Sequence, residues 1–300
     1  MSGSIGFRSS PINGETTLTG ILGGDTSHSV TPFLYSEIFE RLGLNTVYLC
    51  FNTTPENLAN AVNSIRGFSI KAMYITMPYK QKVIPLLDEV DPMANAMGAV
   101  NLVVNNGGIL KGYNIDMLAF MGPLKKTPLK GEKVVLLGSG GAGSACAFGL
   151  AQAGAELTIL SRTEESAASL AQRVTDYFGT KAVGISNSED RLRNELADAF
   201  MVVNSTDIGY GSKEGQTPVP AEFLRKDLIV YDVVNASNTP ITRDARACGA
   251  KVFDGMDFLA YGTKEFVQAL TGKETSQAVV DLALEVGQKV LEYDAQKHNR

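Results

Sequence analysis

Histidine and cysteine, the side chains that most often hold transition metals, are scarce in this 300-residue chain. Neither His28 nor His298 lies near cysteines or near a carboxylate pair at ligand spacing, so the sequence predicts no metal site. The three cysteines, Cys50, Cys146 and Cys248, are odd in number, widely spaced and each set in an apolar context. This pattern predicts free, buried thiols rather than disulfides.

A surplus of positive charge is also missing. The chain has 27 basic and 32 acidic side chains, a net charge of −5, which argues against binding to nucleic acid or to a membrane surface. No apolar stretch approaches the ~18 residues that a membrane-spanning helix needs. Residues 1–17 lack the charged-then-apolar order of a signal peptide. We therefore expect a cytoplasmic protein whose partner is a small molecule.

The first part of the chain alternates short strand-like runs with helical patterns, which is typical of βαβ units around a mainly parallel sheet. Strands are predicted over residues 17–24, 46–51, 71–77, 99–104 and 109–114. The last two flank the turn sequence NNGG, so they should pair as a hairpin. Helices are predicted after Thr54-Pro55, at Asp91-Pro92 and from Pro32, with Thr31 as the N-cap of the last of these.

From Lys130 the pattern changes to a buried strand, a glycine turn, a small-residue helix and a second strand. Further strands are predicted over 182–186, 200–206, 228–234 and 251–255, and two helices end the chain. The predicted fold is α/β, with an N-terminal substrate domain and a Rossmann-type, doubly wound dinucleotide-binding domain. The expected domain limits are 1–116, 117–255 and, for C-terminal helices that pack back on the first domain, 256–300.

The glycine turn GSGGAG places Gly138, Gly140 and Gly143 at the GxGxxG spacing. The first glycine allows a tight turn, the second lets the backbone approach a pyrophosphate, and the third lets the helix pack closely on the strand. The free amides of the helix N-terminus would bind the pyrophosphate. Because strand, turn, helix and second strand occur in register, we predict a dinucleotide site, with glycine-rich packing as the alternative.

The end of the second strand indicates which dinucleotide binds. A site for NAD usually has an acidic residue about 20 positions after the turn, whereas this chain has Ser161, Arg162 and Thr163 there. A guanidinium with hydroxyl groups suits the 2′-phosphate of NADP. We predict NADP, while the neighbouring Glu164 keeps NAD as a second option. The alternative for Arg162 is a solvated loop residue.

Lysine replaces histidine as the candidate proton-transfer group. Lys80 follows a predicted strand and a turn at Pro78, and Asp116 follows another strand and opens a helix. Both should lie at strand carboxyl ends, where ligands bind in open α/β sheets. Oxidation of a carbinol by hydride transfer needs such a group to take the hydroxyl proton. A surface lysine and an N-capping aspartate are the alternative interpretations.

Taken together, these motifs give the chain a resemblance to the shikimate/quinate dehydrogenase family over nearly its whole length. The matching blocks are SHSVTP (27–32), ITMPYK (75–80), GAVN (98–101), GYNID (112–116), LLGSGGAG (136–143), LSRT (160–163), VNSTDIG (203–209), YDVV with TP (231–240) and FDGMDFLA (253–260). The resemblance implies that Lys80 and Asp116 are the catalytic pair. It also implies NADP-dependent, reversible oxidation of a ring carbinol in a cyclic hydroxy acid such as shikimate, within aromatic amino acid biosynthesis.

The resemblance further implies a set of ligand-binding residues. For substrate these are Ser29, Thr31, Thr76, Asn101 and Tyr74. For the cofactor they are Gly138, Ser139, Gly140, Gly141, Ala142, Gly143, Ser161, Arg162, Thr163, Asn204, Ser205, Thr206, Val233 and Gly255. Several also have structural alternatives: Thr31 as an N-cap, Thr76 as a β-branched strand residue, Asn101 as a strand-end residue that binds local backbone, and residues 204–206 as an ordinary strand-to-turn cluster.

Four positions depart from the family pattern: Tyr74, Ile115, Asn235 and Gly262, where the family often has asparagine, threonine, tyrosine and glutamine. Loss of hydrogen bonds at Ile115 and Gly262 would cost about 1 to 3 kcal/mol each, and so lower efficiency on shikimate. We therefore also consider a paralogue that acts on a different hydroxy acid or polyol, and a nucleotide-binding sensor without turnover. A homodimer is one option for assembly.

Overall fold

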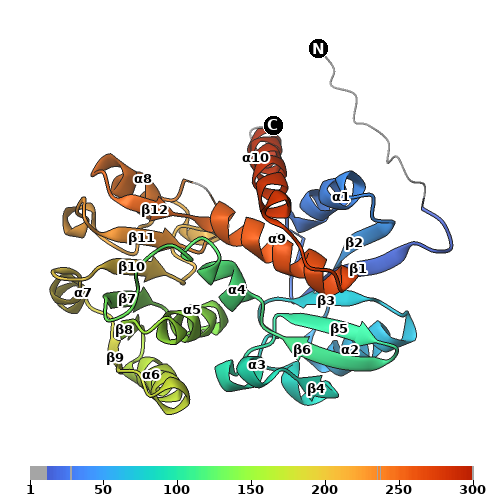
Figure 1. Ribbon diagram of the computed structural model, residues 1–300, viewed down its shortest axis with the longest axis horizontal. Coiled ribbons are helices and arrows are strands. Elements are labelled where there is room, and N and C mark those ends of the chain that lie inside the picture. The colour runs from blue at the N-terminus through green and yellow to red at the C-terminus, as the bar shows by residue number, and fades with distance from the viewer. Residues whose placement is uncertain (1–11, 28, 235, 237, 299–300) are drawn as a thin grey trace.

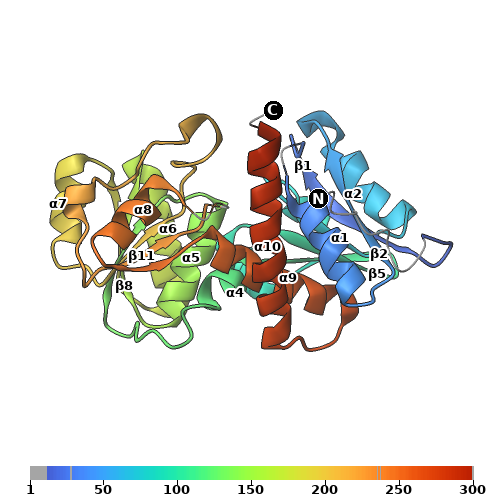
Figure 2. The same ribbon diagram turned by 90° about the horizontal axis from the view of Figure 1, so that it is seen from above.

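The computed structural model describes residues 12–27, 29–234, 236 and 238–298, with side chains described up to residue 290. His28 and Asn235 lie outside the described residues, as does the side chain of His298. Figure 1 shows two halves side by side, each a sheet with flanking helices, and Figure 2 shows the last helix standing between them.

The strands form two sheets of six. The first contains β1 (Thr17–Gly23), β2 (Thr46–Asn52), β3 (Ala72–Ile75), β4 (Glu89–Val90), β5 (Leu102–Asn106) and β6 (Ile109–Tyr113). The second contains β7 (Lys133–Leu137), β8 (Glu156–Ser161), β9 (Ala182–Ser186), β10 (Met201–Asn204), β11 (Ile229–Asp232) and β12 (Lys251–Phe253).

The helices alternate with these strands until the end of the chain. They are α1 (Thr31–Arg41), α2 (Leu58–Gly67), α3 (Pro92–Met97), α4 (Asp116–Met121), α5 (Gly141–Gln152), α6 (Glu164–Phe178), α7 (Glu189–Leu196), α8 (Pro240–Ala247), α9 (Gly255–Thr271) and α10 (Gln277–His298). Short 3₁₀ turns cover Pro55–Asn57, Ile84–Leu86, Gly211–Lys213 and Ala221–Phe223.

The first sheet has the order β2-β1-β3-β5-β6-β4. Strands β1, β2 and β3 are parallel, and the predicted hairpin is present as the antiparallel pair β5–β6. Because β5 runs antiparallel to β3, its start lies beside the end of β3, and the Ile75 amide donates to the Asn101 carbonyl at 2.8 Å. One edge of this sheet therefore collects the ends of β1, β3 and β6 together with the start of β5.

The second sheet is fully parallel, in the order β12-β11-β10-β7-β8-β9. This is the doubly wound arrangement predicted from the glycine turn, and the point where the strand order reverses lies between β7 and β10. Residues that follow β7, β8, β10, β11 and β12 all lie at one edge, since the strands share a direction. The predicted cofactor residues are at that edge.

The last two helices pack against the first half of the molecule. Phe266 of α9 and Val279 and Val286 of α10 share a buried cluster with Leu34 and Tyr35 of α1. Figure 1 shows α9 crossing from the side of β12 toward β1, so this helix links the two halves. Burial of these apolar side chains holds the C-terminal segment on the first sheet.

Some sequence-based expectations are wrong. Thr31 does not cap α1: Val30 is the N-cap, and the Thr31 hydroxyl lies 2.6 Å from the Ser29 hydroxyl instead. Cys146 is buried and all three cysteines are free, but Cys50 and Cys248 are exposed. Cys50 lies on edge strand β2, and Cys248 is the residue after α8, so apolar neighbours in sequence did not imply burial.

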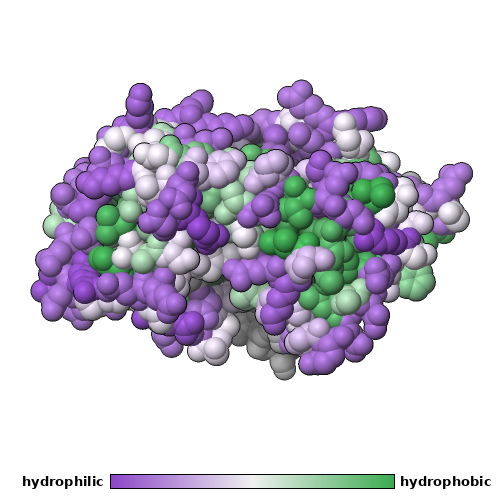
Figure 3. Space-filling model, turned by 90° about the horizontal axis from the view of Figure 1, so that it is seen from below, coloured by the Kyte–Doolittle hydropathy of each residue, from purple (hydrophilic) through white to green (hydrophobic). Residues whose placement is uncertain are grey.

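Within the described residues, no helix is long and apolar enough to cross a membrane. The underside of the molecule is largely polar, with apolar residues gathered mainly over the half that carries the first sheet (Figure 3). Among the same residues, no group of three or more histidine, cysteine, aspartate or glutamate side chains could hold a metal ion.

Candidate active site

Lys80 lies in a turn that is anchored on both sides. Tyr79 is fully buried, and its hydroxyl donates to the Thr53 carbonyl at 2.6 Å. The Tyr79 amide donates to the Thr76 carbonyl at 2.9 Å, and the Lys80 carbonyl accepts from the Val100 amide at 2.8 Å. These contacts fix the backbone on which the lysine side chain is carried, so little conformational freedom remains to be lost at this position.

Asp116 is the first residue of α4 and is buried. Its amide donates to Asn114 Oδ1 at 3.1 Å, and Asn114 Nδ2 donates to the Ala99 carbonyl at 2.9 Å. The preceding amide, that of Ile115, donates to Asn101 Oδ1 at 2.8 Å. Two asparagine side chains therefore satisfy backbone groups at the start of α4 and hold Asp116 in place.

The two predicted proton-transfer residues meet. Lys80 Nζ lies 2.5 Å from Asp116 Oδ2, and their side chains are 20% and 11% exposed. An ion pair shielded to this extent is stronger than a surface pair, and the two other protons of the ammonium remain available for a ligand. Lys80 is thus not a free surface lysine, and Asp116 is not the N-cap of its helix, because that position belongs to Ile115.

Lys80 also lies against the glycine turn of the other half. A Cβ atom built on Gly141 would lie 3.3 Å from Lys80 Cδ, so the lysine stem passes over the first residue of α5. Two further contacts join the halves at α3: Ser144 Oγ and Arg173 Nη1 donate to the Met97 carbonyl at 2.8 and 2.6 Å. The edge of the first sheet therefore faces the glycine turn of the second.

The other predicted substrate residues lie at the same edge of the first sheet. Ser29 and Thr31 are paired through their hydroxyl groups in the segment after β1, and Thr76 directly follows β3. Asn101 precedes β5 and is buried. Its Oδ1 accepts from Ile115, as the structural alternative expects, but its Nδ2 has no partner among the described residues. Because an unsatisfied buried donor costs free energy, this amide favours a ligand at the edge.

The glycine turn has the geometry that a dinucleotide site needs. Gly138 has φ +105°, and a Cβ on Gly143 would lie 2.4 Å from the Gly138 carbonyl oxygen, so both positions require glycine. Gly140 has no atom within 4 Å of its Cβ position and is open to a ligand. The 12-residue helix α5 follows directly, so its free amides point at this open space.

Hydroxyl groups gather where the 2′-phosphate of NADP is expected. Ser139 Oγ lies 2.8 Å from Ser161 Oγ and 3.0 Å from Ser166 Oγ, and Thr163 Oγ1 lies 2.8 Å from Ser166 Oγ. Arg162 is exposed beside them. Glu164 is the acidic residue for which NAD was considered as an alternative. Its Oε2 lies 3.1 Å from Arg191 Nη1, and that guanidinium lowers the pKa of the Glu164 carboxyl.

The loop after β10 is held from within. Asn204 is fully buried: its Nδ2 donates to Asp232 Oδ1 at 2.9 Å, and its Oδ1 accepts from the Thr206 hydroxyl at 2.6 Å. Ser205 Oγ donates to the Leu137 carbonyl at 2.7 Å. These side chains therefore shape the loop. At Gly255 a Cβ would lie 1.7 Å from the Val234 carbonyl oxygen, so this glycine permits a close approach of two segments of the backbone.

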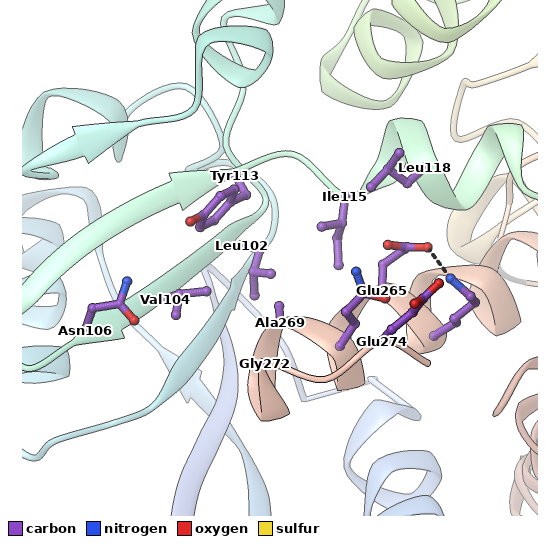
Figure 4. A pocket seen from close by; sticks show the side chains of 12 residues that line it. Leu102, Val104, Asn106, Tyr113, Ile115, Leu118, Glu265, Ala269, Gly272 and Glu274 are labelled. Atoms are coloured by element: carbon purple, nitrogen blue, oxygen red, sulfur yellow. Dashed lines mark hydrogen bonds and ion pairs between the residues drawn. The ribbon is translucent and has the colours of Figure 1, made fainter. Parts of the chain in front are cut away.

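Two of the departures from the family pattern, Tyr74 and Gly262, are in contact, whereas Ile115 lies elsewhere. Tyr74 contacts Gly262 through a hydrogen bond of 3.2 Å from its hydroxyl to the Gly262 carbonyl. Ile115 instead lines a pocket of about 790 Å³ between the β5–β6 hairpin and α9 (Figure 4). That pocket is bounded by Leu102, Tyr113 and α9 residues, and neither Lys80 nor Asp116 belongs to it.

Three residues with clear roles at this site were not identified from the sequence. Asn114 binds the start of α4, Tyr79 anchors the lysine turn, and Ser144 joins the two halves. An asparagine two residues before Asp116 is a recognisable turn signal, since its side chain can accept from the backbone two residues on. The roles of Tyr79 and Ser144 depend on contacts 26 and 47 residues away in sequence, for which no local signal exists.

Comparisons with known proteins agree with this geometry. Residues 21–103 match the model of the shikimate dehydrogenase substrate binding domain. Residues 134–208 match that of the saccharopine dehydrogenase NADP binding domain. The curated shikimate dehydrogenase (NADP(+)) of Dehalococcoides mccartyi strain CBDB1 is 38% identical over 247 residues, which span 81% of this chain and 86% of that protein.

Solved structures with known ligands are also similar over nearly the whole chain. Shikimate 5-dehydrogenase of Listeria monocytogenes, in complex with shikimate and NAD, is 30% identical with a TM-score of 0.83 and covers 93% of this chain and 98% of its own. Quinate dehydrogenase of Corynebacterium glutamicum, in complex with NAD, is 29% identical with a TM-score of 0.82 and covers 91% and 99%. The chain therefore belongs to the shikimate dehydrogenase family, and it is an NAD(P)-dependent dehydrogenase that acts on a CH–OH group.

Proposed function

We propose that this enzyme catalyses the reversible, NADP-dependent oxidation of a ring carbinol in a cyclic hydroxy acid, with shikimate as the first candidate. The observation that carries the proposal is the Lys80–Asp116 pair, held at 2.5 Å at the sheet edge that faces the glycine turn. An amine and a carboxylate in contact can exchange a proton with a substrate hydroxyl group. The edge also offers hydroxyl groups at Ser29 and Thr31 for a carboxylate.

Lys80 would move the proton. In the direction of oxidation the neutral amine form of Lys80 takes the proton of the carbinol oxygen and becomes the ammonium, and in reduction the ammonium returns that proton. Asp116 holds Lys80 in position, where its ammonium form stabilises negative charge on the reacting oxygen. Asn101 Nδ2, which lacks a protein partner among the described residues, would donate to a second substrate hydroxyl.

The residues of the second half fit NADP. Gly138 and Gly143 leave no room for side chains, Gly140 is open, and the α5 amides would hold the pyrophosphate. Arg162 and the hydroxyl groups of Ser161 and Thr163 would hold the 2′-phosphate. NADP supplies the hydride acceptor when bound. The pairing of Glu164 with Arg191 reduces the repulsion that a lone carboxylate would exert on a phosphate at this place.

We also propose how the chain is divided into domains and where the protein is located in the cell. We assign residues 1–116 to the substrate domain, 117–255 to the cofactor domain and 256–300 to the returning helices. Support comes from the division of strands, because β1–β6 precede Asp116 and β7–β12 follow it. A cytoplasmic location is supported by the composition and by the net charge of −5.

A substrate panel tests the activity. Purified protein with NADP or NAD is mixed with shikimate, quinate and related hydroxy acids, and the absorbance of reduced nicotinamide is followed. We expect turnover of at least one acid, faster with NADP than with NAD. NADP binding is measured separately by calorimetry. Tight NADP binding without turnover of any acid would contradict the proposal and favour a non-catalytic nucleotide sensor.

A further inference from the structure

Two of the departures from the family pattern are in direct contact although they lie 188 positions apart. Tyr74, the third residue of β3, donates from its hydroxyl to the Gly262 carbonyl on α9 at 3.2 Å. Its ring stacks on Phe266, one turn further along α9, with ring centres 4.8 Å apart and planes at 20°. The tyrosine is therefore fixed at both its ring and its hydroxyl group.

The hydroxyl of Tyr74 has little hydrogen-bonding capacity left. A tyrosine hydroxyl has one proton to donate and two lone pairs to accept with. Its proton goes to Gly262, and the Tyr35 hydroxyl donates to it at 3.4 Å. Burial raises the pKa of Tyr74 well above its usual range and that of Tyr35 to about 12, so both stay protonated near neutral pH. At most one acceptor and no donor face a ligand.

A small unfilled space lies beside this hydroxyl. A Cβ built on Gly262 would lie 3.6 Å from Ala119 Cβ and 3.7 Å from the Tyr74 hydroxyl oxygen, and these are the atoms that it would meet within 4 Å beyond its chain neighbours and the backbone of its own helix. We call this space the Gly262 notch. Ala119 lies three residues after Asp116 on α4, so the two share a face of that helix about 5 Å apart along its axis. The notch is therefore one helical turn from the carboxylate of the ion pair.

We propose that Tyr74 and Gly262 together determine substrate choice, and that the enzyme prefers a hydroxy acid whose ring edge beside α9 carries no hydroxyl group. The inference rests on the proposed function of the same site. A wall built to hydrogen-bond a hydroxyl rejects the analogue that lacks it by about 10⁴-fold or more, because its polar groups are left unpaired. Here the Tyr74 proton is already donated within the protein, so an unsubstituted ring edge leaves no donor unpaired and can lie against the notch.

Equilibrium binding tests this preference without requiring turnover. The Lys80→Met variant, loaded with NADP, is titrated calorimetrically with shikimate and with two analogues that each lack one of the hydroxyls that do not react. We expect one analogue to bind at least as tightly as shikimate and the other to bind more weakly. Weaker binding of both analogues by tenfold or more, or no binding of any of the three, would overturn the inference. Preserved binding ratios combined with a wild-type enzyme that turns over no acid would instead contradict the proposed function alone.

Filling the notch tests the role of Gly262 itself. Gly262→Ala places a methyl group at ordinary contact distances, so the protein should fold, with a Tm equal to or above that of the wild type. We expect the favoured analogue to bind five- to tenfold more weakly. Gly67→Ala is the matched control, because Gly67 is also a helical glycine and has no atom within 4 Å of its Cβ position. A changed Tm with unchanged binding ratios would show that Gly262 is only structural.

The Tyr74→Phe variant separates the hydroxyl from the ring. Phenylalanine keeps the stacking on Phe266 but removes the last acceptor from the wall, so shikimate should lose affinity while the favoured analogue keeps it within about twofold. An equal loss for both ligands would overturn the assignment of the hydroxyl to substrate choice.

Discussion

Lys80 lies at the edge of the first sheet that faces the glycine turn, and Tyr74 and Gly262 form what we call the wall. The edge and the wall differ in how their polar groups are hydrogen-bonded. At the edge, Lys80 has two further protons to donate and Asn101 Nδ2 has no partner among the described residues. At the wall, Tyr74 donates to Gly262 and accepts from Tyr35. Polar groups without a hydrogen-bond partner favour binding of a ligand, whereas groups that are already hydrogen-bonded contribute mainly the shape of the surface. We therefore infer the reaction from the residues at the edge, and we propose that Tyr74 and Gly262 select the substrate.

Removal of the Lys80 ammonium group should have the greatest effect on turnover. Lys80→Met keeps an unbranched stem across Gly141 but removes the ammonium group, so turnover should fall by about 10²- to 10⁴-fold, the usual contribution of a proton-transfer group. The Kd for NADP, measured by calorimetry, should change by less than about twofold, since the cofactor is held by the other half. Lys82→Met, an exposed lysine two residues on, is the control. Turnover within tenfold of the wild type in Lys80→Met would contradict the mechanism.

The glycine turn allows a sharper test, because two of its glycines are needed for different reasons. In Gly143→Ala the new methyl group meets the Gly138 carbonyl oxygen at 2.4 Å, which should lower the free energy of unfolding by about 1 to 3 kcal/mol. In Gly140→Ala the methyl group meets no protein atom, so stability should hold while NADP affinity falls. Urea unfolding and calorimetry distinguish the two. Equal loss of stability in both variants would show that Gly140 serves packing only.

Arg162 determines how strictly the cofactor edge selects NADP. In Arg162→Ala, loss of a charged hydrogen bond worth about 1.5 to 3 kcal/mol should reduce kcat/KM for NADP by about ten- to hundredfold, with little change for NAD. Arg193→Ala serves as the control, because Arg193 is an exposed arginine paired with Glu189 in α7. Equal losses for both cofactors would leave Arg162 as a structural residue.

Removal of the Tyr35 hydroxyl should change stability only slightly. Tyr35→Phe removes the hydroxyl that donates to Tyr74 over a long 3.4 Å contact, so the free energy of unfolding should fall by only about 0.5 to 1 kcal/mol. The Tyr74 hydroxyl would then offer two lone pairs to a ligand instead of one. Shikimate affinity relative to its deoxy analogues should rise severalfold, which calorimetry measures. A fall in that ratio would show that Tyr35 contacts the ligand directly.

Local chemistry allowed much of the fold and the edge to be predicted. Asp91 caps α3 through its own carboxylate, which accepts from the Met93 and Ala94 amides at 3.0 and 3.2 Å. The NNGG turn specifies the β5–β6 hairpin within a few residues. The glycine spacing likewise specifies a strand, turn and helix, and Lys80 and Asp116 follow strand ends in sequence. Each of these features is determined by neighbours in the chain.

Features that depend on distant contacts could not be predicted in this way. The Thr31 hydroxyl could have capped α1, but a hydroxyl from the loop before it is its partner. Asn204 carries an amide that could bind the cofactor, but its Nδ2 donates to Asp232 on the neighbouring strand. The contact of Tyr74 with Gly262 joins β3 to α9 across most of the chain. The contact between Tyr74 and Gly262 therefore cannot be found from any local pattern in the sequence.

A crystal structure of the enzyme with NADP and shikimate would show directly whether Lys80 is placed to move the proton. We predict that Lys80 Nζ lies within about 3 Å of the reacting oxygen, still in contact with Asp116, with the nicotinamide ring on the opposite side of the same carbon. A structure in which Lys80 points into bulk water, away from both ligands, would contradict the account.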